Sequence, residues 1–340
     1  MPTITILGGG VAGLALAAAL DPTAYDVTLV ERRPGSSKVP TASGIWPFAL
    51  AALERIELAD ELRARGLLLT SGVVTACGAR RPVATTGRDA DLWLITRPAL
   101  LQLLDESVPD TVVREQRQAD DVATLGGDLV VAADGARSVV RRQIWGDEPR
   151  DTGVVAVRGV LETPPDAPLD QMHEFWGDGL LFGVGPNRLP HLVGTNWYAS
   201  ARRGEDTPAE ALAWARDAYA GFPELVQVAL ATADPEQTVV NTILESRRPR
   251  ELVRGRYVLV GDAAHAMSPN LGRGACEAMV DAVVLGEALN EHGLDGARRY
   301  ERTRLRAGQR TRAAAAMARR LALSRRASRA LVLVVARLGG

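Results

Sequence analysis

A glycine-rich turn near the N-terminus constrains the fold of this chain more than any other feature. Residues 3–7 read as a strand, glycines follow at Gly8, Gly10 and Gly13, and an apolar helical run leads into a second strand that ends at Glu31. In such a unit, the first glycine makes a tight turn, the second lets the backbone approach a pyrophosphate, and the third lets the helix pack on the strand. Glu31 is placed to accept hydrogen bonds from a ribose hydroxyl. The segment therefore predicts a dinucleotide site.

Two later segments also end a buried strand with an acid. Residues 128–134 run into Asp134 and a glycine, and residues 257–262 run into Gly261 and Asp262. Ligands of open parallel sheets bind beyond the carboxyl ends of the strands. Taken singly, each Asp could be ordinary turn chemistry, but together with the glycine turn and Glu31 they predict one shared crevice.

A second glycine-rich segment follows Asp262. Pro269 precedes Gly272-Arg273-Gly274, and a helical pattern runs from residue 275 to 289. Exposed amides and the positive end of the helix dipole favour a negative ligand at such a helix start. A reduced flavin anion is a ligand of this kind.

The middle of the chain has a different pattern of predicted secondary structure. Short strands over 154–160, 172–176, 180–184 and 191–197 are broken by Gly and Pro, then helices are expected over 207–220 and 222–231 and a strand over 238–244. Aromatic residues gather between positions 172 and 198. We interpret this region as a substrate sheet inserted into the first domain, although a plain β core would show the same pattern.

Length and composition indicate what broad class of protein this is. A chain of 340 residues has room for about two domains, and its two cysteines, Cys77 and Cys276, favour a reducing, cytoplasmic setting. We expect no signal peptide and no membrane span; residues 330–339 are apolar but too short to cross a bilayer. Residues 298–329 carry twelve arginines and one glutamate, which we interpret as the solvated face of a helix and not as a nucleic-acid site.

Taken together, these motifs resemble the single-component (class A) FAD-dependent monooxygenases, the group that includes para-hydroxybenzoate hydroxylase. The resemblance rests on the N-terminal glycine turn with Glu31, on Asp134-Gly135-Ala136-Arg137-Ser138, and on Gly261-Asp262-Ala263-Ala264-His265 with its downstream Pro and Gly-x-Gly. Arg97 with Leu101 matches the family's Arg-x-x-Leu, and residues 44–50 match the stretch before its second helix. Arg273 and Cys276 depart from the residues common in the family.

The resemblance implies a Rossmann-like FAD-binding domain built from residues 1–71, 97–152 and 247–340, with a mixed or antiparallel β-sheet substrate domain from residues 72–96 and 153–246. It implies noncovalent FAD, NAD(P)H as a transient co-substrate, and no metal. The implied cofactor-binding residues are Gly8, Gly10, Gly13, Glu31, Arg32, Arg33, Arg97, Asp134, Asp262, Pro269, Gly272, Arg273 and Gly274. Pro269, Gly272 and Gly274 are the expected catalytic backbone beside the flavin ring. Trp46, Phe175, Phe182 and Trp197 are the candidate substrate contacts.

The expected reaction is a monooxygenation. NAD(P)H reduces the flavin, dioxygen adds to its C4a carbon, and the hydroperoxide transfers one oxygen atom to a small aromatic, polycyclic or unsaturated organic substrate. Two alternatives stay open: a reductase or dehydrogenase of the same fold that does not transfer oxygen, and a non-catalytic FAD-binding protein. The substrate, the choice of NADH or NADPH and the oligomeric state do not follow from the sequence.

Several other polar residues have two interpretations each. His173, His191 and Tyr198 could act as a base toward a phenol, but we interpret each of them as a structural residue, and no general base is assigned. Arg158 could pair with an acidic substrate or form a salt bridge at a strand edge. His265 and Cys276 are interpreted as scaffold residues.

Overall fold

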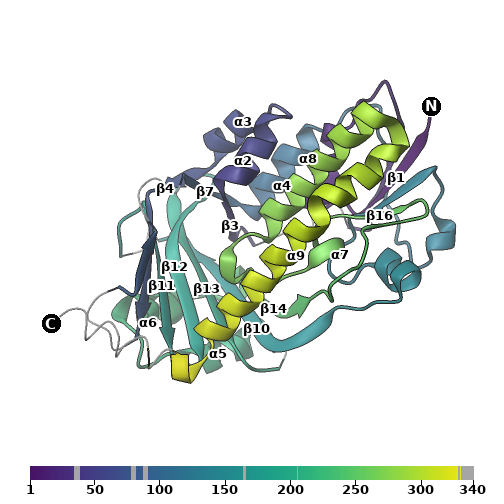
Figure 1. Ribbon diagram of the computed structural model, residues 1–340. Coiled ribbons are helices and arrows are strands. Elements are labelled where there is room, and N and C mark those ends of the chain that lie inside the picture. Colours follow the sequence, from purple (N-terminus) through teal and green to yellow (C-terminus); the bar gives the residue numbers. More distant parts are fainter. Residues whose placement is uncertain are drawn as a thin grey trace.

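The computed structural model describes residues 1–33, 39–77, 82–86, 91–163, 166–204, 206–327 and 330. Within these residues the chain forms three β-sheets with helices packed on them (Figure 1). This arrangement confirms the predicted α/β class, with a Rossmann-like part and a separate, mostly antiparallel sheet.

The Rossmann-like part is built on a six-stranded sheet. Its strands, in spatial order, are β15 (Val253–Arg254), β16 (Tyr257–Leu259), β9 (Leu129–Ala132), β1 (Thr3–Leu7), β2 (Asp26–Val30) and β8 (Val113–Glu115). All neighbours are parallel except β15 and β16, which form an antiparallel pair. The central strands are apolar and largely buried, as strands covered by helices on both faces must be.

Helices pack around this sheet and complete the larger core. They are α1 (Val11–Ala19), α2 (Pro47–Glu54), α3 (Ala59–Arg65), α4 (Arg97–Glu106), α7 (Gly261–His265), α8 (Gly274–His292) and α9 (Gly296–Ala322). α8 packs against α1, α2 and α9. Small residues allow the close approach of α1 and α8, because a Cβ on Gly286 would lie 2.7 Å from that of Ala19.

The second large sheet has seven strands. In spatial order they are β14 (Thr238–Glu245), β10 (Arg150–Leu161), β13 (Val193–Ala201), β12 (Leu180–Arg188), β11 (Gln171–Gly177), β5 (Ser71–Ala76) and β6 (Ala84–Thr86). Only the β11–β5 pair is parallel. Helices α5 (Pro208–Ala218) and α6 (Glu224–Thr232) cover one face and form a second core with it.

A small three-stranded sheet joins the two parts. Its strands are β3 (Ala42–Ile45), β7 (Leu92–Thr96) and β4 (Leu67–Leu69), and both pairings are antiparallel. β7 thus pairs with strands from the N-terminal region, whereas β5 and β6 join the seven-stranded sheet. The remaining short turns of helix are η2 (Val122–Thr124), η3 (Arg141–Trp145), η4 (Pro235–Gln237), η5 (Pro269–Leu271) and η6 (Gly293–Asp295).

The arginine-rich helix α9 runs diagonally from the parallel sheet to the seven-stranded sheet (Figure 1). At its end, Ala322 and Leu323 pack against strand residues of that sheet. Most arginines of α9 are exposed, as the sequence predicts, but Arg304 and Arg319 are exceptions and are buried, with 8% and 4% of their surface exposed. They are buried because each meets buried acidic side chains from other elements.

Among the described residues, no helix is long and apolar enough to cross a membrane. Within the same residues, no cluster of three or more His, Cys, Asp or Glu side chains is arranged to hold a metal ion. The apolar C-terminal segment singled out in the sequence lies almost wholly outside the described residues.

Candidate functional site

The predicted ligand positions meet at one edge of the parallel sheet. Leu7, the last residue of β1, is in register with the last residues of β2 and β9, and β9 is in turn in register with Leu259 of β16. Gly8, Glu31, Asp134 and Asp262 follow these strand ends within three residues. The sheet therefore brings the four positions together, as parallel strands that end in register require.

The glycine turn after β1 is closely packed on two sides and open on a third. Gly8 has a φ of +109°, and a Cβ there would lie 2.4 Å from the Ala133 carbonyl oxygen. A Cβ on Gly13 would lie 1.9 Å from the Gly8 carbonyl oxygen. Gly10, by contrast, has no atom within 4 Å of its Cβ position. Its open side lies at the start of α1, where free backbone amides attract anions.

Glu31 fixes the loops on either side of it. One carboxylate oxygen, Oε2, accepts from the Gly9 amide at 2.7 Å, and the other, Oε1, accepts from the Arg33 amide at 2.7 Å. The side chain is half-buried, and a carboxylate oxygen can accept more than one hydrogen bond. Arg32 and Arg33 are exposed beside it. Glu31 is thus held in place and still able to receive a hydroxyl donor.

Asp134 has an oxygen without a partner. Its Oδ2 accepts from the Val139 amide at 2.7 Å, whereas Oδ1 is buried and has no hydrogen-bond partner among the described residues. Burial raises the pKa of this carboxyl. A buried, unpaired acceptor is costly, so a ligand that donates a hydrogen bond to Oδ1 would stabilise the site.

Arg141 was not singled out in the sequence, yet it connects two of the motifs. Its guanidinium donates to the carbonyl oxygens of Ala263 and Ala264, at 2.9 and 2.7 Å, and to that of Arg247 at 2.8 Å. Arg141 also pairs with Asp147. The only signal in the sequence is its place shortly after Ser138, which does not reveal what it contacts. Arg141 holds the Asp134 and Asp262 segments in a fixed relation.

A buried ionic network on α8 and α9 supports the turn that contains Asp262. Asp281 on α8 accepts from the Gly261 amide at 2.9 Å, contacts His265 Nε2 at 2.5 Å and accepts from Arg304 Nε at 2.6 Å. Burial works against ionisation, but His265 and Arg304 hold the pKa of Asp281 below its ordinary value. His265 therefore has the scaffold position that the sequence suggested. Asp262 itself is exposed, and its carboxylate has no partner among the described residues.

The loop from Pro269 to Gly274 leads into α8. Pro269 begins a short turn, Gly272 has a φ of +60°, and α8 begins at Gly274. The guanidinium of Arg273 lies over the Phe48 ring at 4.2 Å and donates to Glu277 at 3.0 Å. Neither Gly274 nor Gly10 has a neighbouring atom within 4 Å of the Cβ position. The backbone of this loop is therefore accessible at the start of a long helix.

Trp46 lies beside this loop. A Cβ on Gly272 would be 3.7 Å from Trp46 Nε1, and Cys276 Sγ donates to the Gly44 carbonyl at 3.2 Å. Burial raises the pKa of the Cys276 thiol to about 11, in keeping with its scaffold interpretation. The structure thus brings Trp46 close to the predicted catalytic backbone.

The other three predicted substrate contacts face away from the crevice. Phe175, Phe182 and Trp197 lie in the core between the seven-stranded sheet and helices α5 and α6. Phe182 stacks on Trp197 with ring centroids 5.8 Å apart. Their placement corrects the sequence-based expectation, because side chains alternate between the two faces of a strand and these three share the helix-covered face.

The histidines considered as bases are also placed away from the crevice-facing side of the sheet. His173 stacks on Phe175 at 6.5 Å, and burial lowers the pKa of its imidazole. His191 is exposed between β12 and β13. Tyr198 alone of the three candidates lies on the face opposite to α5 and α6.

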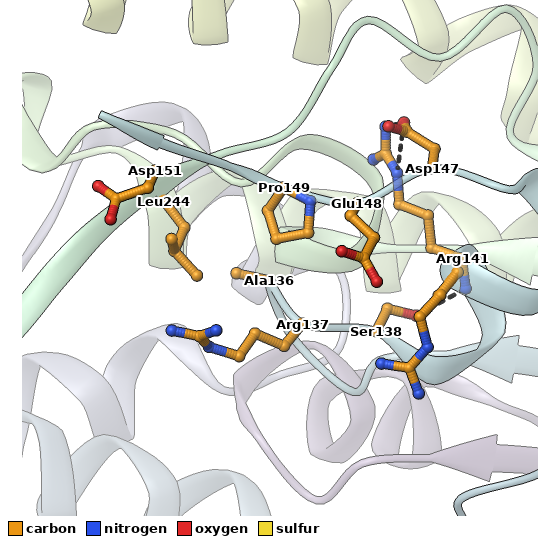
Figure 2. Close-up of a pocket in the computed structure, with 10 residues that line it drawn as sticks. Ala136, Arg137, Ser138, Arg141, Asp147, Glu148, Pro149, Asp151 and Leu244 are labelled. Carbon is orange, nitrogen blue, oxygen red and sulfur yellow. Dashed lines mark hydrogen bonds and ion pairs between the residues drawn. The ribbon is translucent and has the colours of Figure 1, made fainter. Parts of the chain in front are cut away.

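A separate pocket of about 200 Å³ lies beside the segment that follows Asp134 (Figure 2). Figure 2 shows Arg141 bonded to Asp147 at one side of it, with Arg137 and Leu244 on the other. Three arginines and three acidic residues line the pocket: Arg137, Arg141, Arg142, Asp147, Glu148 and Asp151. Its opposed charges give no preference for an anion or a cation.

Comparison with known proteins gives two matching family models. One, described as an FAD binding domain, matches residues 100–320. The other, an NAD(P)-binding Rossmann-like domain, matches residues 6–37.

Similar proteins cover most of the chain. The aurachin C monooxygenase/isomerase of Stigmatella aurantiaca is 30% identical over 319 residues, which is 85% of this chain and 80% of the relative. The 2-heptyl-3-hydroxy-4(1H)-quinolone synthase of Pseudomonas aeruginosa is 32% identical and covers 83% of this chain and 79% of its own length. The crystal structure of Klebsiella pneumoniae HpxO complexed with FAD and uric acid has the same fold, with a TM-score of 0.84, 23% identity, and coverage of 98% of this chain and 92% of that one.

Proposed function

Because this chain belongs to the class A FAD-dependent monooxygenases, we propose that it uses NAD(P)H and dioxygen to insert one oxygen atom into a small aromatic or polycyclic organic molecule. The family resemblance, the FAD cofactor and the oxidoreductase class expected from the sequence are confirmed by these comparisons. Further relatives are named as a 6-hydroxynicotinate 3-monooxygenase, an FAD-dependent urate hydroxylase and a 3-amino-4-hydroxybenzoate 2-monooxygenase, which favours oxygen transfer over a simple reductase. Which molecule this chain oxidises is part of the proposal.

The residues at the sheet edge fit a dinucleotide such as FAD. The observation that carries the proposal is the buried Asp134 Oδ1 without a partner, together with the open backbone at Gly10 and Gly274. We assign Glu31 to the ribose, with Arg32 and Arg33 on the adenine side, and Gly8, Gly10 and Gly13 to the pyrophosphate turn. Arg97 and Asp262 are assigned to the middle of the cofactor.

When bound, FAD supplies the redox chemistry that activates dioxygen. The contribution of the chain is electrostatic and steric. The amides at Gly272 to Gly274 and the start of α8 would stabilise negative charge next to Pro269, because unpaired amides at a helix N-terminus carry partial positive charge. Trp46 beside Gly272 would help to exclude water from that position. We assign the parallel sheet and its helices to the cofactor, and the seven-stranded sheet to the substrate.

Oxygen transfer is tested with labelled dioxygen. The purified holoenzyme is screened against phenols, polycyclic aromatics and alkenes for faster NAD(P)H oxidation, and the product of an accelerating compound is analysed by mass spectrometry. We expect one labelled oxygen atom in the product for each NAD(P)H consumed. An unlabelled product would replace the proposal with the reductase alternative, and a protein that holds FAD but never consumes NAD(P)H would indicate a binding protein.

Replacing Asp262 by Asn should weaken FAD binding roughly 10- to 100-fold, the range of one charge-assisted hydrogen bond. The substitution keeps the size of the side chain and removes only its charge. The measurement is the FAD content of purified protein and the Kd on rebinding. Asp217→Asn, on the exposed side of α5, is the matched control and should retain wild-type affinity. Equal affinities in both variants would remove Asp262 from the cofactor site.

A further inference from the structure

Arg158 is a cation without a hydrogen-bond partner among the described residues, on the strand next to the β14 edge of the seven-stranded sheet. It lies on β10 and is half-buried, and among the described residues no carboxylate, hydroxyl or carbonyl oxygen accepts a hydrogen bond from it. The strand-edge salt bridge that the sequence left open is therefore not formed within this part of the chain. Burial and the nearby charge of Arg97 lower the pKa of Arg158, but a guanidinium stays protonated in proteins.

The side chain lies on the crevice side of the sheet. Arg158 alternates with Val157, which belongs to the core under α5 and α6, so Arg158 belongs to the opposite face. Arg97 and Asp262, both assigned to the cofactor, are close enough for their charges to act on it. Arg158 therefore lies on the face of the seven-stranded sheet that is turned toward the proposed FAD site.

A row of polar side chains continues from Arg158 across the same face. Arg158 is directly opposite Tyr198 on β13, Tyr198 is opposite Gly183 on β12, and Gly183 is opposite Glu174 on β11. Gly183 leaves room for the tyrosine ring, since a Cβ there would lie 2.0 Å from it. Tyr198 can thus reach over β12 to Glu174.

Glu174 determines how Tyr198 can hydrogen-bond. The Tyr198 hydroxyl donates to Glu174 Oε2 at 2.7 Å, and Trp176 Nε1 donates to Oε1 at 2.5 Å. Because the tyrosine proton is held by Glu174, the phenolic oxygen can take part in a further hydrogen bond only as an acceptor. The row therefore offers a ligand one strong donor, Arg158, and one acceptor, Tyr198.

We propose that Arg158 binds a carbonyl or anionic oxygen attached to the substrate ring, while Tyr198 accepts from a ring N–H or O–H. A half-buried cation without a partner is unfavourable, and an acceptor oxygen of the substrate removes that cost. This inference rests on the proposed function, since it assigns the substrate side of the same site.

The test compares three flat bicyclic ligands by isothermal titration calorimetry on the FAD-loaded protein. 4-Quinolone has a carbonyl and an N–H, chromone has the carbonyl alone, and quinoline has neither. Wild type should bind 4-quinolone at least about tenfold more tightly than quinoline. Arg158→Met should weaken the binding of 4-quinolone and of chromone about 10- to 100-fold. It should change the affinity for quinoline less than about threefold. Arg202→Met, an exposed arginine just after β13, is the matched control and should behave as wild type.

A second variant keeps the proposal testable if Arg158→Met does not retain FAD. Tyr198→Phe should abolish the preference for 4-quinolone over chromone, because only the N–H depends on the phenolic oxygen. Equal binding of 4-quinolone and quinoline by wild type, or an unchanged preference in the variants, overturns the proposal. These are binding measurements, so they can fail while labelled oxygen still reaches a product, and they can succeed while oxygen transfer fails.

Discussion

Replacing Arg304 by methionine should lower the free energy of unfolding by about 3–5 kcal/mol, the usual cost of removing one partner of a buried ion pair. Arg304 is buried on α9, where its Nε donates to Asp281 at 2.6 Å and its Nη2 donates to Glu277. Methionine fills similar space but removes the guanidinium that both buried carboxylates share, which leaves Asp281 with His265 and Glu277 with Arg273. Urea denaturation followed by circular dichroism measures the change.

Arg306→Met is the control for this prediction. It makes the same substitution two residues along α9 at an exposed position, and its effect should stay within about 0.5 kcal/mol. We also expect Arg304→Met to lose FAD, because Asp281 holds the Gly261 amide and Glu277 holds Arg273. A loss of stability below about 1 kcal/mol would show that the network is not coupled to the fold in this way.

Replacing Gly13 by alanine should destabilise the protein by about 3 kcal/mol or more, the upper range for overpacking. The added methyl would lie 1.9 Å from the Gly8 carbonyl oxygen, and this neighbour is backbone, which cannot move aside without opening the turn. Thermal unfolding of the FAD-free protein measures the effect on the fold alone.

Gly10→Ala should change FAD binding without changing the stability of the fold. Gly10 has ordinary extended backbone angles and no atom within 4 Å of its Cβ position, so the FAD-free variant should unfold at the wild-type temperature. Its methyl would occupy the space through which a pyrophosphate approaches, and FAD affinity should fall at least about tenfold. Wild-type FAD affinity in Gly10→Ala would place the phosphates elsewhere.

The sequence determined the parts of this protein that follow from local rules. The turn from Gly8 to Gly13 needs glycines for steric reasons that act within one strand–turn–helix unit. Asp134 and Asp262 follow buried strands within three residues, and parallel strands present their carboxyl ends along one edge. The candidate cofactor residues could therefore be predicted without knowing the rest of the fold.

Only the tertiary structure decided which side of each element faces which neighbour. Alternation along β11 to β13 puts Phe175 and Trp197 on one face and Glu174 and Tyr198 on the other, but the positions of α5 and α6 determine which face becomes core. In the same way, Ala and Leu at helical spacing among the arginines of α9 predict a helix, whereas the acids that bury Arg304 come from α8. Whether Arg158 has a partner depends on β13 and β14, the strands that lie beside β10 only in the folded sheet. Such pairings join residues far apart in sequence, so local patterns cannot specify them.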